Sequence, residues 1–181
     1  MRRIGFALVS RTLFLLAAAT MLYAQMAPPS PAPELKKLEF LTGDWTAEGT
    51  MTPGPPGTPT SKWSMSAHGE WMEGNFFLIQ HSDMDLGPMG KGKDISFMGF
   101  DPDKKVYTYK AFNSMGEAED STGTVDGDTW TWTSDEHMNG MTMKGRYTMK
   151  VLSPTSYTMK YELSQDGTNW MTAMEGKATK K

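Results

Sequence analysis

Ten short segments with strand-like patterning fill the chain from residue 44 to residue 178 and constrain its fold more than any other feature. In the clearest of them, Trp63, Met65 and Ala67 alternate with Lys62 and Ser64. A strand with one buried face produces that period of two. In one segment, 76–84, both faces are apolar, so its inward side stays ambiguous. We predict strands at 44–51, 61–72, 76–84, 94–100, 106–113, 119–125, 129–134, 141–151, 157–164 and 170–178.

Turn residues join these segments in sequence. Asp126-Gly127 is a strong hairpin signal, and Pro102 presets a turn after Asp101. Consecutive hairpins are typical of an antiparallel sandwich or an up-and-down barrel. We favour the barrel, because hairpins need no crossover and closure removes the exposed sheet edges. The predicted fold class is therefore all-β, an antiparallel up-and-down β-barrel of about ten strands with a short N-terminal helical turn.

The N-terminal helical turn is predicted at 34–41, where Leu35, Leu38 and Leu41 share one face. We expect it to form a lid that packs on the end of the barrel, in preference to a helix that binds a partner. Gly43 permits a sharp change of direction before the first strand. Trp45 then opens that strand, and a large ring at this point suits a plug that closes one end of the barrel.

The first 24 residues resemble a secretory signal peptide. Arg2, Arg3 and Arg11 precede a short apolar run that is too brief to span a bilayer, and a cleavage site follows before Gln25. We divide the chain into a signal peptide at 1–24, a proline-rich spacer at 25–33 and a single β-barrel domain at 34–181. The predicted location is periplasmic or secreted by a Sec-type signal, and no membrane span remains after cleavage. There is no cysteine, so disulfides and a lipoprotein anchor are excluded.

Charge limits the classes of partner. Removal of the signal peptide shifts the formal net charge from −3 to −6. A mildly acidic protein lacks the positive field that nucleic acid attracts, so no nucleic-acid partner is expected. The oligomeric state stays open.

The chain resembles the DUF1579 family of bacterial proteins of unknown function, and its opening Gly-x-Trp also resembles that of lipocalins and other calycins. In those barrels a basic residue from a late strand covers the tryptophan, and the resemblance implies that Arg146 or Lys177 does so here. The family carries no assigned activity. The resemblance rests on Phe40-Leu41-Thr42-Gly43-Asp44-Trp45, Met98-Gly99-Phe100-Asp101-Pro102-Asp103-Lys104-Lys105-Val106-Tyr107, Ser121-Thr122-Gly123-Thr124-Val125 and Met174-Glu175-Gly176-Lys177-Ala178.

Aromatic residues on the predicted inward faces are the candidate ligand-binding residues. A barrel of this size either fills its interior with side chains or holds one small apolar molecule. We therefore predict a protein that binds a small apolar or amphipathic molecule without catalysis. The alternative is a solid-core module of the cell envelope with an interaction or structural role. The candidates are Trp63, Trp71, Tyr107, Tyr109, Trp130, Trp132 and Tyr147.

No catalytic residue, cofactor or metal site is predicted. His68, His81 and His137 lack the spacing of metal ligands, and His81 does not share a strand face with its neighbours Ser82 and Asp83. Two less favoured alternatives remain. One is a Cu(I) site at 137–143, where thioethers lie close to an imidazole. The other is an enzyme that uses Glu70, Asp83 or Arg146 at the barrel mouth.

Overall fold

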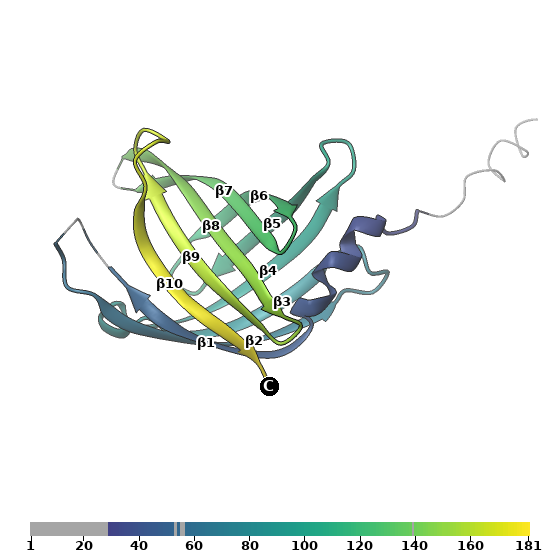
Figure 1. Cartoon of the computed structure of the whole chain (residues 1–181), viewed down its shortest axis with the longest axis horizontal. Helices are drawn as coiled ribbons and strands as arrows, with labels where there is room; N and C mark the ends of the chain where they lie inside the picture. The colour runs from purple at the N-terminus through teal and green to yellow at the C-terminus, as the bar shows by residue number, and fades with distance from the viewer. Residues whose placement is uncertain (1–28, 53, 55–56, 139) are drawn as a thin grey trace, which may run out of the picture. The chain divides into compact units, whose positions relative to one another are not determined.

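The computed structural model of the protein describes residues 29–52, 54, 57–138 and 140–181. These residues form ten antiparallel strands and two short 3₁₀ helices (Figure 1). The elements are η1 (Pro33–Leu41), β1 (Gly43–Met51), β2 (Ser61–Trp71), β3 (Leu78–Asp85), η2 (Gly87–Met89), β4 (Lys91–Asp101), β5 (Val106–Asn113), β6 (Ala118–Asp126), β7 (Thr129–Met138), β8 (Met141–Ser153), β9 (Ser156–Ser164) and β10 (Met171–Lys180).

The sheet is a closed barrel in which each strand pairs with the next along the chain and β10 pairs with β1. The closing pair runs from Trp45 opposite Lys180 to Met51 opposite Met174. The predicted all-β, ten-stranded, up-and-down barrel is therefore confirmed. The strand bounds differ most at β4, which begins at Lys91 directly after η2, and at β7, which extends to Met138.

The register settles the ambiguous face of β3. Leu78, Gln80, Ser82 and Met84 lie opposite Trp71, Gly69, Ala67 and Met65 of β2, which all face the interior. The inward face of β3 is therefore half polar. Phe76 and Phe77 precede the strand, and Phe77 lies outside against Gly99, where an added Cβ would come within 2.7 Å of its ring.

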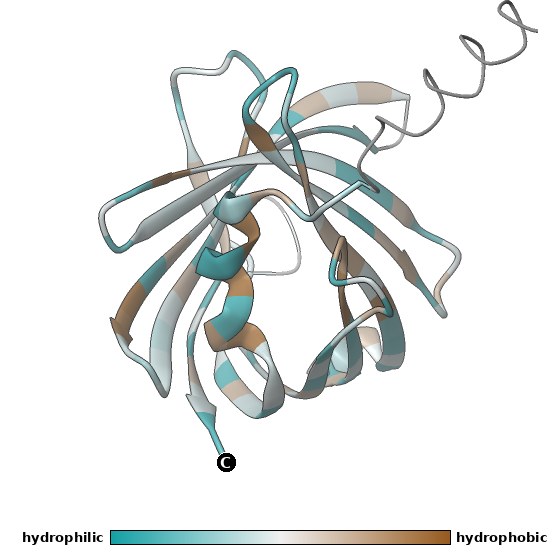
Figure 2. Ribbon diagram, turned by 90° about the vertical axis from the view of Figure 1, so that its right-hand side faces the viewer, coloured by the Kyte–Doolittle hydropathy of each residue, from teal (hydrophilic) through white to brown (hydrophobic). Residues whose placement is uncertain are grey.

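The helix η1 closes one end of the barrel, hereafter the closed end. A 3₁₀ helix has three residues per turn, so Leu35, Leu38 and Leu41 fall on a single face, and all three are buried. The Leu41 carbonyl reaches the inner surface at Gly69, where a Cβ would lie only 2.3 Å from that oxygen. Figure 2 shows η1 in the foreground, with apolar and polar residues alternating along it.

Polar contacts hold η1 in place. The Tyr107 hydroxyl donates a hydrogen bond to the Glu34 carbonyl at 2.9 Å, and Trp71 Nε1 donates to the Glu39 carboxylate at 2.7 Å. Gly43 follows the helix with a φ of 81°, a conformation that glycine adopts without strain. The lid predicted from the leucine spacing is therefore fixed to the barrel by both apolar and polar contacts.

Trp45 is fully buried at the closed end, as predicted. Its ring packs on Tyr157 at 5.1 Å and on Phe40 at 6.4 Å between centroids. The cation over its face is Lys180, with Nζ 5.7 Å from the ring centroid. The two residues expected in that role lie on the outer surface. Arg146 pairs with Glu162 and lies 4.0 Å over the Trp170 ring, and Lys177 is exposed opposite Glu48.

Contacts within the chain divide it into two units, Met1–Ser30 and Pro31–Lys181. The barrel and η1 make up the second unit. The predicted signal peptide at 1–24 and residues 25–28 of the spacer lie outside the described residues, so these remain predictions. Among the residues that the structure describes, no helix has the length and apolar character to cross a membrane.

Candidate functional site

The end of the barrel opposite η1, hereafter the open end, is bounded by five loops. They are the connections β1–β2, β3–β4, β5–β6, β7–β8 and β9–β10. The other four hairpins lie at the closed end beside η1 (Figure 1). Side chains at the closed end fill the interior, since Leu38, Trp45 and Leu78 are each fully buried.

The seven aromatic residues selected from the sequence all take inward positions in the register, but they divide into three groups. Trp71, Tyr107 and Trp130 belong to the closed end, where Tyr107 and Trp130 lie 4.7 Å apart and Trp130 also packs on Phe40. Trp132 lies next to this group, farther from the closed end, and its ring stacks on that of Trp130 with 6.1 Å between centroids and 11° between planes.

Trp63 forms part of the barrel wall. Its ring lies over Gly176, its partner on β1 is Gly49, and its Nε1 donates to the carbonyls of Thr50 and Glu175, each at 3.1 Å. It is only 4% exposed. Trp63 therefore lines the interior as a flat surface with its polar atom already satisfied.

Tyr109 and Tyr147 behave differently, because each is deep in the protein and still partly accessible. Burial raises the pKa of Tyr147 well above its ordinary value and raises that of Tyr109 in the same direction. Both side chains nevertheless keep part of their surface exposed to solvent. These two side chains are therefore surrounded by protein atoms and keep accessible surface on the inner side of the barrel wall.

Three carboxylates that the sequence reasoning missed lie on this inner side of the wall. Asp94 lies opposite Ser82 and Asn113, and Glu119 lies opposite the buried Ala111. Glu136 lies opposite Met143 on the same strand face as Trp130 and Trp132. The sequence contains the evidence for these positions, because each acid lies two positions from an inward-facing residue of the same strand. The predicted seventh strand, 129–134, stops two residues before Glu136.

Short-range contacts and electrostatics tie these acids together. The Ser121 hydroxyl donates to Glu119 Oε1 at 2.9 Å, and the Ser134 hydroxyl donates to Glu136 Oε1 at 2.6 Å. Burial raises the pKa of Asp94 to about 6. Burial also raises the pKa of Glu119, and repulsion from Glu136 and Asp94 adds to that shift.

Tyr161 completes the group. Burial raises the pKa of its phenol, and the neighbouring Glu136 carboxylate raises it further. Glu119 also affects the phenols of Tyr109 and Tyr147. We refer to the set as the acid–tyrosine cluster, which consists of Asp94, Tyr109, Glu119, Glu136, Tyr147 and Tyr161.

Solvent reaches this cluster. Glu119 is exposed although it faces inward, and Asp94 and Glu136 are partly exposed. Gln80, on the neighbouring strand β3, is only 9% exposed. Its Nε2 makes no hydrogen bond to any of the described residues. A buried amide donor without a partner is costly unless water or a ligand satisfies it.

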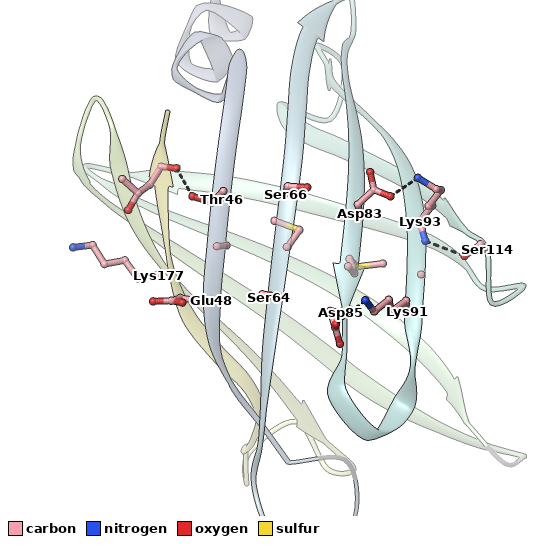
Figure 3. A pocket seen from close by; sticks show the side chains of 15 residues that line it. Thr46, Glu48, Ser64, Ser66, Asp83, Asp85, Lys91, Lys93, Ser114 and Lys177 are labelled. Carbon is pink, nitrogen blue, oxygen red and sulfur yellow. Dashed lines mark hydrogen bonds and ion pairs between the residues drawn. The ribbon is translucent and has the colours of Figure 1, made fainter.

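A hollow lies on the outer face of β10, β1, β2, β3 and β4 and has a volume of about 970 Å³ (Figure 3). Four of its six charged side chains form ion pairs with one another. Lys93 binds Asp83, and Lys91 Nζ lies 3.4 Å from Asp85. Shallow ion pairs of this kind are ordinary surface features.

The enzyme alternative placed Glu70, Asp83 and Arg146 at the barrel mouth. Glu70 is exposed on an outward position, Asp83 is paired with Lys93, and Arg146 is paired with Glu162. None of the three lies in the interior.

The described part of the chain contains no group of three or more acidic or histidine side chains arranged to hold a metal ion. His68 is on the surface, with Nδ1 2.7 Å from Asp44 Oδ1. In the region suggested for Cu(I), His137 bonds Thr142 at 3.1 Å and Met141 is 50% exposed. The Met138 side chain and Asn139 lie outside the described residues.

Comparison with solved structures shows the same fold in two other proteins. Rv2717c from M. tuberculosis matches with a TM-score of 0.55 and 13% sequence identity, over 84% of this chain and 99% of its own. The S-type phycobiliprotein lyase CPES from Guillardia theta matches with a TM-score of 0.55 and 11% identity, over 81% of this chain and 91% of its own. At such identities the likeness concerns the fold alone.

No curated protein matches the chain. A family described as a protein of unknown function, DUF1579, matches residues 30–180, which include all ten strands and η1. The chain therefore belongs to the DUF1579 family.

Proposed function

We propose that this protein is an exported barrel that binds one small amphipathic molecule in the open half of its interior, without catalysis. The observation that carries the proposal is the contrast between the two ends. Side chains fill the closed end, whereas the inward-facing Asp94, Glu119, Glu136, Tyr109 and Tyr147 keep accessible surface nearer the open end.

The lining suggests the orientation of the ligand. Trp132 and Met149 supply apolar surface toward the closed end, and both are buried against the aromatic group there. The carboxylates lie nearer the loops of the open end. An apolar portion would therefore enter first, and a polar portion would stay near the mouth.

A neutral fluorescent probe, N-phenyl-1-naphthylamine, tests this function. We expect saturable uptake with one probe per barrel. Glu119→Trp should reduce the affinity by at least about tenfold, because it fills an inward position at the mouth. Asp120→Trp is the matched control, since Asp120 is the next residue and faces outward, where it pairs with Lys110. The absence of saturable uptake by the wild-type protein would argue instead for the solid-core alternative.

Asp94 favours a second candidate, an enzyme that transfers protons on the bound molecule. A carboxyl group with a pKa of about 6 is suited to act as a general acid or base near neutral pH. Mass spectrometry of small molecules extracted from the purified wild-type and Asp94→Asn proteins separates the two functions. A binding protein retains the same molecule in both, whereas an enzyme retains an unconverted molecule in the variant.

Export is tested separately. N-terminal sequencing of protein recovered from the expressing bacterium should find a mature chain that begins at Gln25. A chain that still carries Met1 and remains in the cytoplasm would contradict export without affecting the proposed binding.

A further inference from the structure

Charge is divided between the two faces of the barrel wall. The carboxylates of Asp94, Glu119 and Glu136 face the interior. The described basic side chains on the strands take outward positions, with the exception of Lys180, which lies over Trp45 at the closed end. Several of them pair with outward acids, as Lys110 does with Asp120 and Lys144 with Asp135. The three inward carboxylates therefore have no inward basic partner among the described residues of the open half.

Such an arrangement is unfavourable in the free protein. Burial raises the pKa of both Asp94 and Glu119, which means that their charged forms are destabilised by the surroundings. At neutral pH Asp94, with a pKa of about 6, still carries its charge most of the time. A positively charged ligand would remove this destabilisation, and an anionic ligand would increase it.

The tyrosines in the acid–tyrosine cluster supply a second element of cation recognition. The face of an aromatic ring attracts a cation within about 6 Å, and the attraction is stronger where water is partly excluded. Tyr109, Tyr147 and Tyr161 lie close enough to the acids for Glu119 to perturb the pKa of each phenol. Aromatic faces beside carboxylates suit a substituted ammonium group better than a bare metal ion.

Gln80 provides an independent sign of a missing ligand group. Gln80 lies opposite Ser96 on β4, and Asp94 is the next inward-facing residue of that strand toward the open end, so the Gln80 side chain enters the interior beside Asp94. The Nε2 donor has no partner among the described residues, and the side chain is nine-tenths buried. A ligand oxygen that accepts from this donor would complete the site.

We propose that the open half of the interior binds an organic ammonium cation whose apolar tail points toward Trp132 and whose hydrogen-bond acceptor meets Gln80. This inference rests on the proposed function and specifies the chemical class of the ligand. The acids balance the charge, the tyrosine rings contact the carbon atoms attached to nitrogen, and Gln80 selects for an oxygen atom.

Three amphiphiles with the same eight-carbon chain test the charge preference by titration calorimetry, namely octyltrimethylammonium, octanesulfonate and 1-octanol. We expect octyltrimethylammonium to bind at least about tenfold more tightly than the other two. Glu119→Gln and Glu136→Gln should each weaken it by about five- to tenfold, as expected for the loss of one partly screened charge pair. Asp120→Asn, on the outer face, should leave its affinity within about twofold.

Octanoylcholine tests the role of Gln80, because it adds an ester acceptor to the same cation. We expect the wild-type protein to prefer octanoylcholine over octyltrimethylammonium and Gln80→Leu to abolish that preference. If Gln80→Leu prefers octanoylcholine as strongly as the wild-type protein does, the role assigned to Gln80 is overturned. Thermal unfolding monitored by circular dichroism shows whether each variant is folded before titration.

The outcomes separate this inference from the proposed function. Equal binding of all three amphiphiles would overturn the cation preference and leave the proposed function intact. Binding of none would overturn both. An equal loss of cation affinity in Asp120→Asn and Glu119→Gln would show that general surface charge, and not the interior, attracts the cation, and would overturn the inference.

Discussion

Glycines in the wall determine where the Trp63 ring lies. A Cβ on Gly176 would come within 2.5 Å of both the Glu48 carbonyl oxygen and the Trp63 ring. A Cβ on Gly49 would lie 1.9 Å from the Glu175 carbonyl oxygen. The two strands can therefore approach closely beneath the indole only because neither position carries a side chain.

Gly176→Ala should lower the free energy of unfolding by about 1–3 kcal/mol, because the added methyl group displaces Trp63 and the Glu48 backbone. Urea unfolding followed by tryptophan fluorescence measures the change. Thr179→Ala, an exposed outward position on the same strand, should change it by less than about 0.5 kcal/mol. Equal stability of Gly176→Ala and the wild type would contradict the close packing at this wall.

The raised pKa of Asp94 predicts a specific dependence of stability on pH. Its pKa is about 6 in the folded protein and 3.8 ordinarily, so the folded state holds the proton more tightly. The contribution of Asp94 to stability is therefore present below about pH 4 and is lost as the pH rises to about 6. Tyr109 and Glu119 face Asp94, and His81 from the outer face of β3 opposes the shift.

Asp94→Asn should therefore be more stable than the wild type at pH 7 and should lose this advantage at pH 4. Denaturant unfolding at both values measures the difference between the two proteins. Asp135→Asn is the contrasting control. Its hydrogen bond to Lys144 lowers the pKa of Asp135, so this variant should lose stability at neutral pH and approach the wild type as the pH falls.

At the scale of an element, η1 is the part of the chain that makes the two ends of the barrel different. The helix is short and cannot be stable alone, so its order depends on packing against the barrel. Leu38 is fully buried, and the bonds from Tyr107 and Trp71 hold the backbone and Glu39 on either side of it.

Leu38→Ala should lower the free energy of unfolding by about 2–4 kcal/mol, the usual cost of a cavity in place of a buried leucine. Chemical denaturation measures this loss, and Lys37→Ala on the exposed face of η1 is the control. If the helix merely rests on the barrel without closing it, both variants will have nearly wild-type stability.

The strands could be predicted from the sequence because alternation and turn residues act locally. All ten were found, and so was the leucine face of η1. The inward side of β3 could not be assigned, since Phe76-Phe77-Leu78-Ile79 is apolar throughout and only pairing with β2 distinguishes its faces. The prediction of Arg146 or Lys177 as the cation over Trp45 is also wrong. The residue of β10 that lies opposite Trp45 depends on the register between β1 and β10.

The acid–tyrosine cluster shows where prediction of a site reached its limit. Its tyrosines Tyr109 and Tyr147 were selected as aromatic residues of the inward face, and its acids were not. Acidic residues on strands are usually solvated, so composition argues against placing Glu119 inside. Counting in steps of two from Trp132 would have reached Glu136, but how the acids gather in the interior depends on the arrangement of several strands.

At the scale of the whole molecule, closure by β1 and β10 removes the edges of the sheet. Deletion of residues 171–181 would expose β1 and β9, and exposed edges pair with other chains. We expect this deletion to produce soluble aggregates or precipitate, seen by size-exclusion chromatography. Deletion of Lys181 alone should leave the protein's elution unchanged. A truncated chain that elutes like the intact protein would contradict the role of closure.

The pairing of β1 with β10 also decides where the last residue emerges. The Lys181 amide donates to the Asp44 carbonyl at 2.9 Å, beside the start of β1 and the end of η1. A surface or fluorophore attached through the C-terminus would therefore lie at the closed end. The open end would stay accessible to dissolved compounds, which makes a C-terminally immobilised barrel a convenient format for screening them.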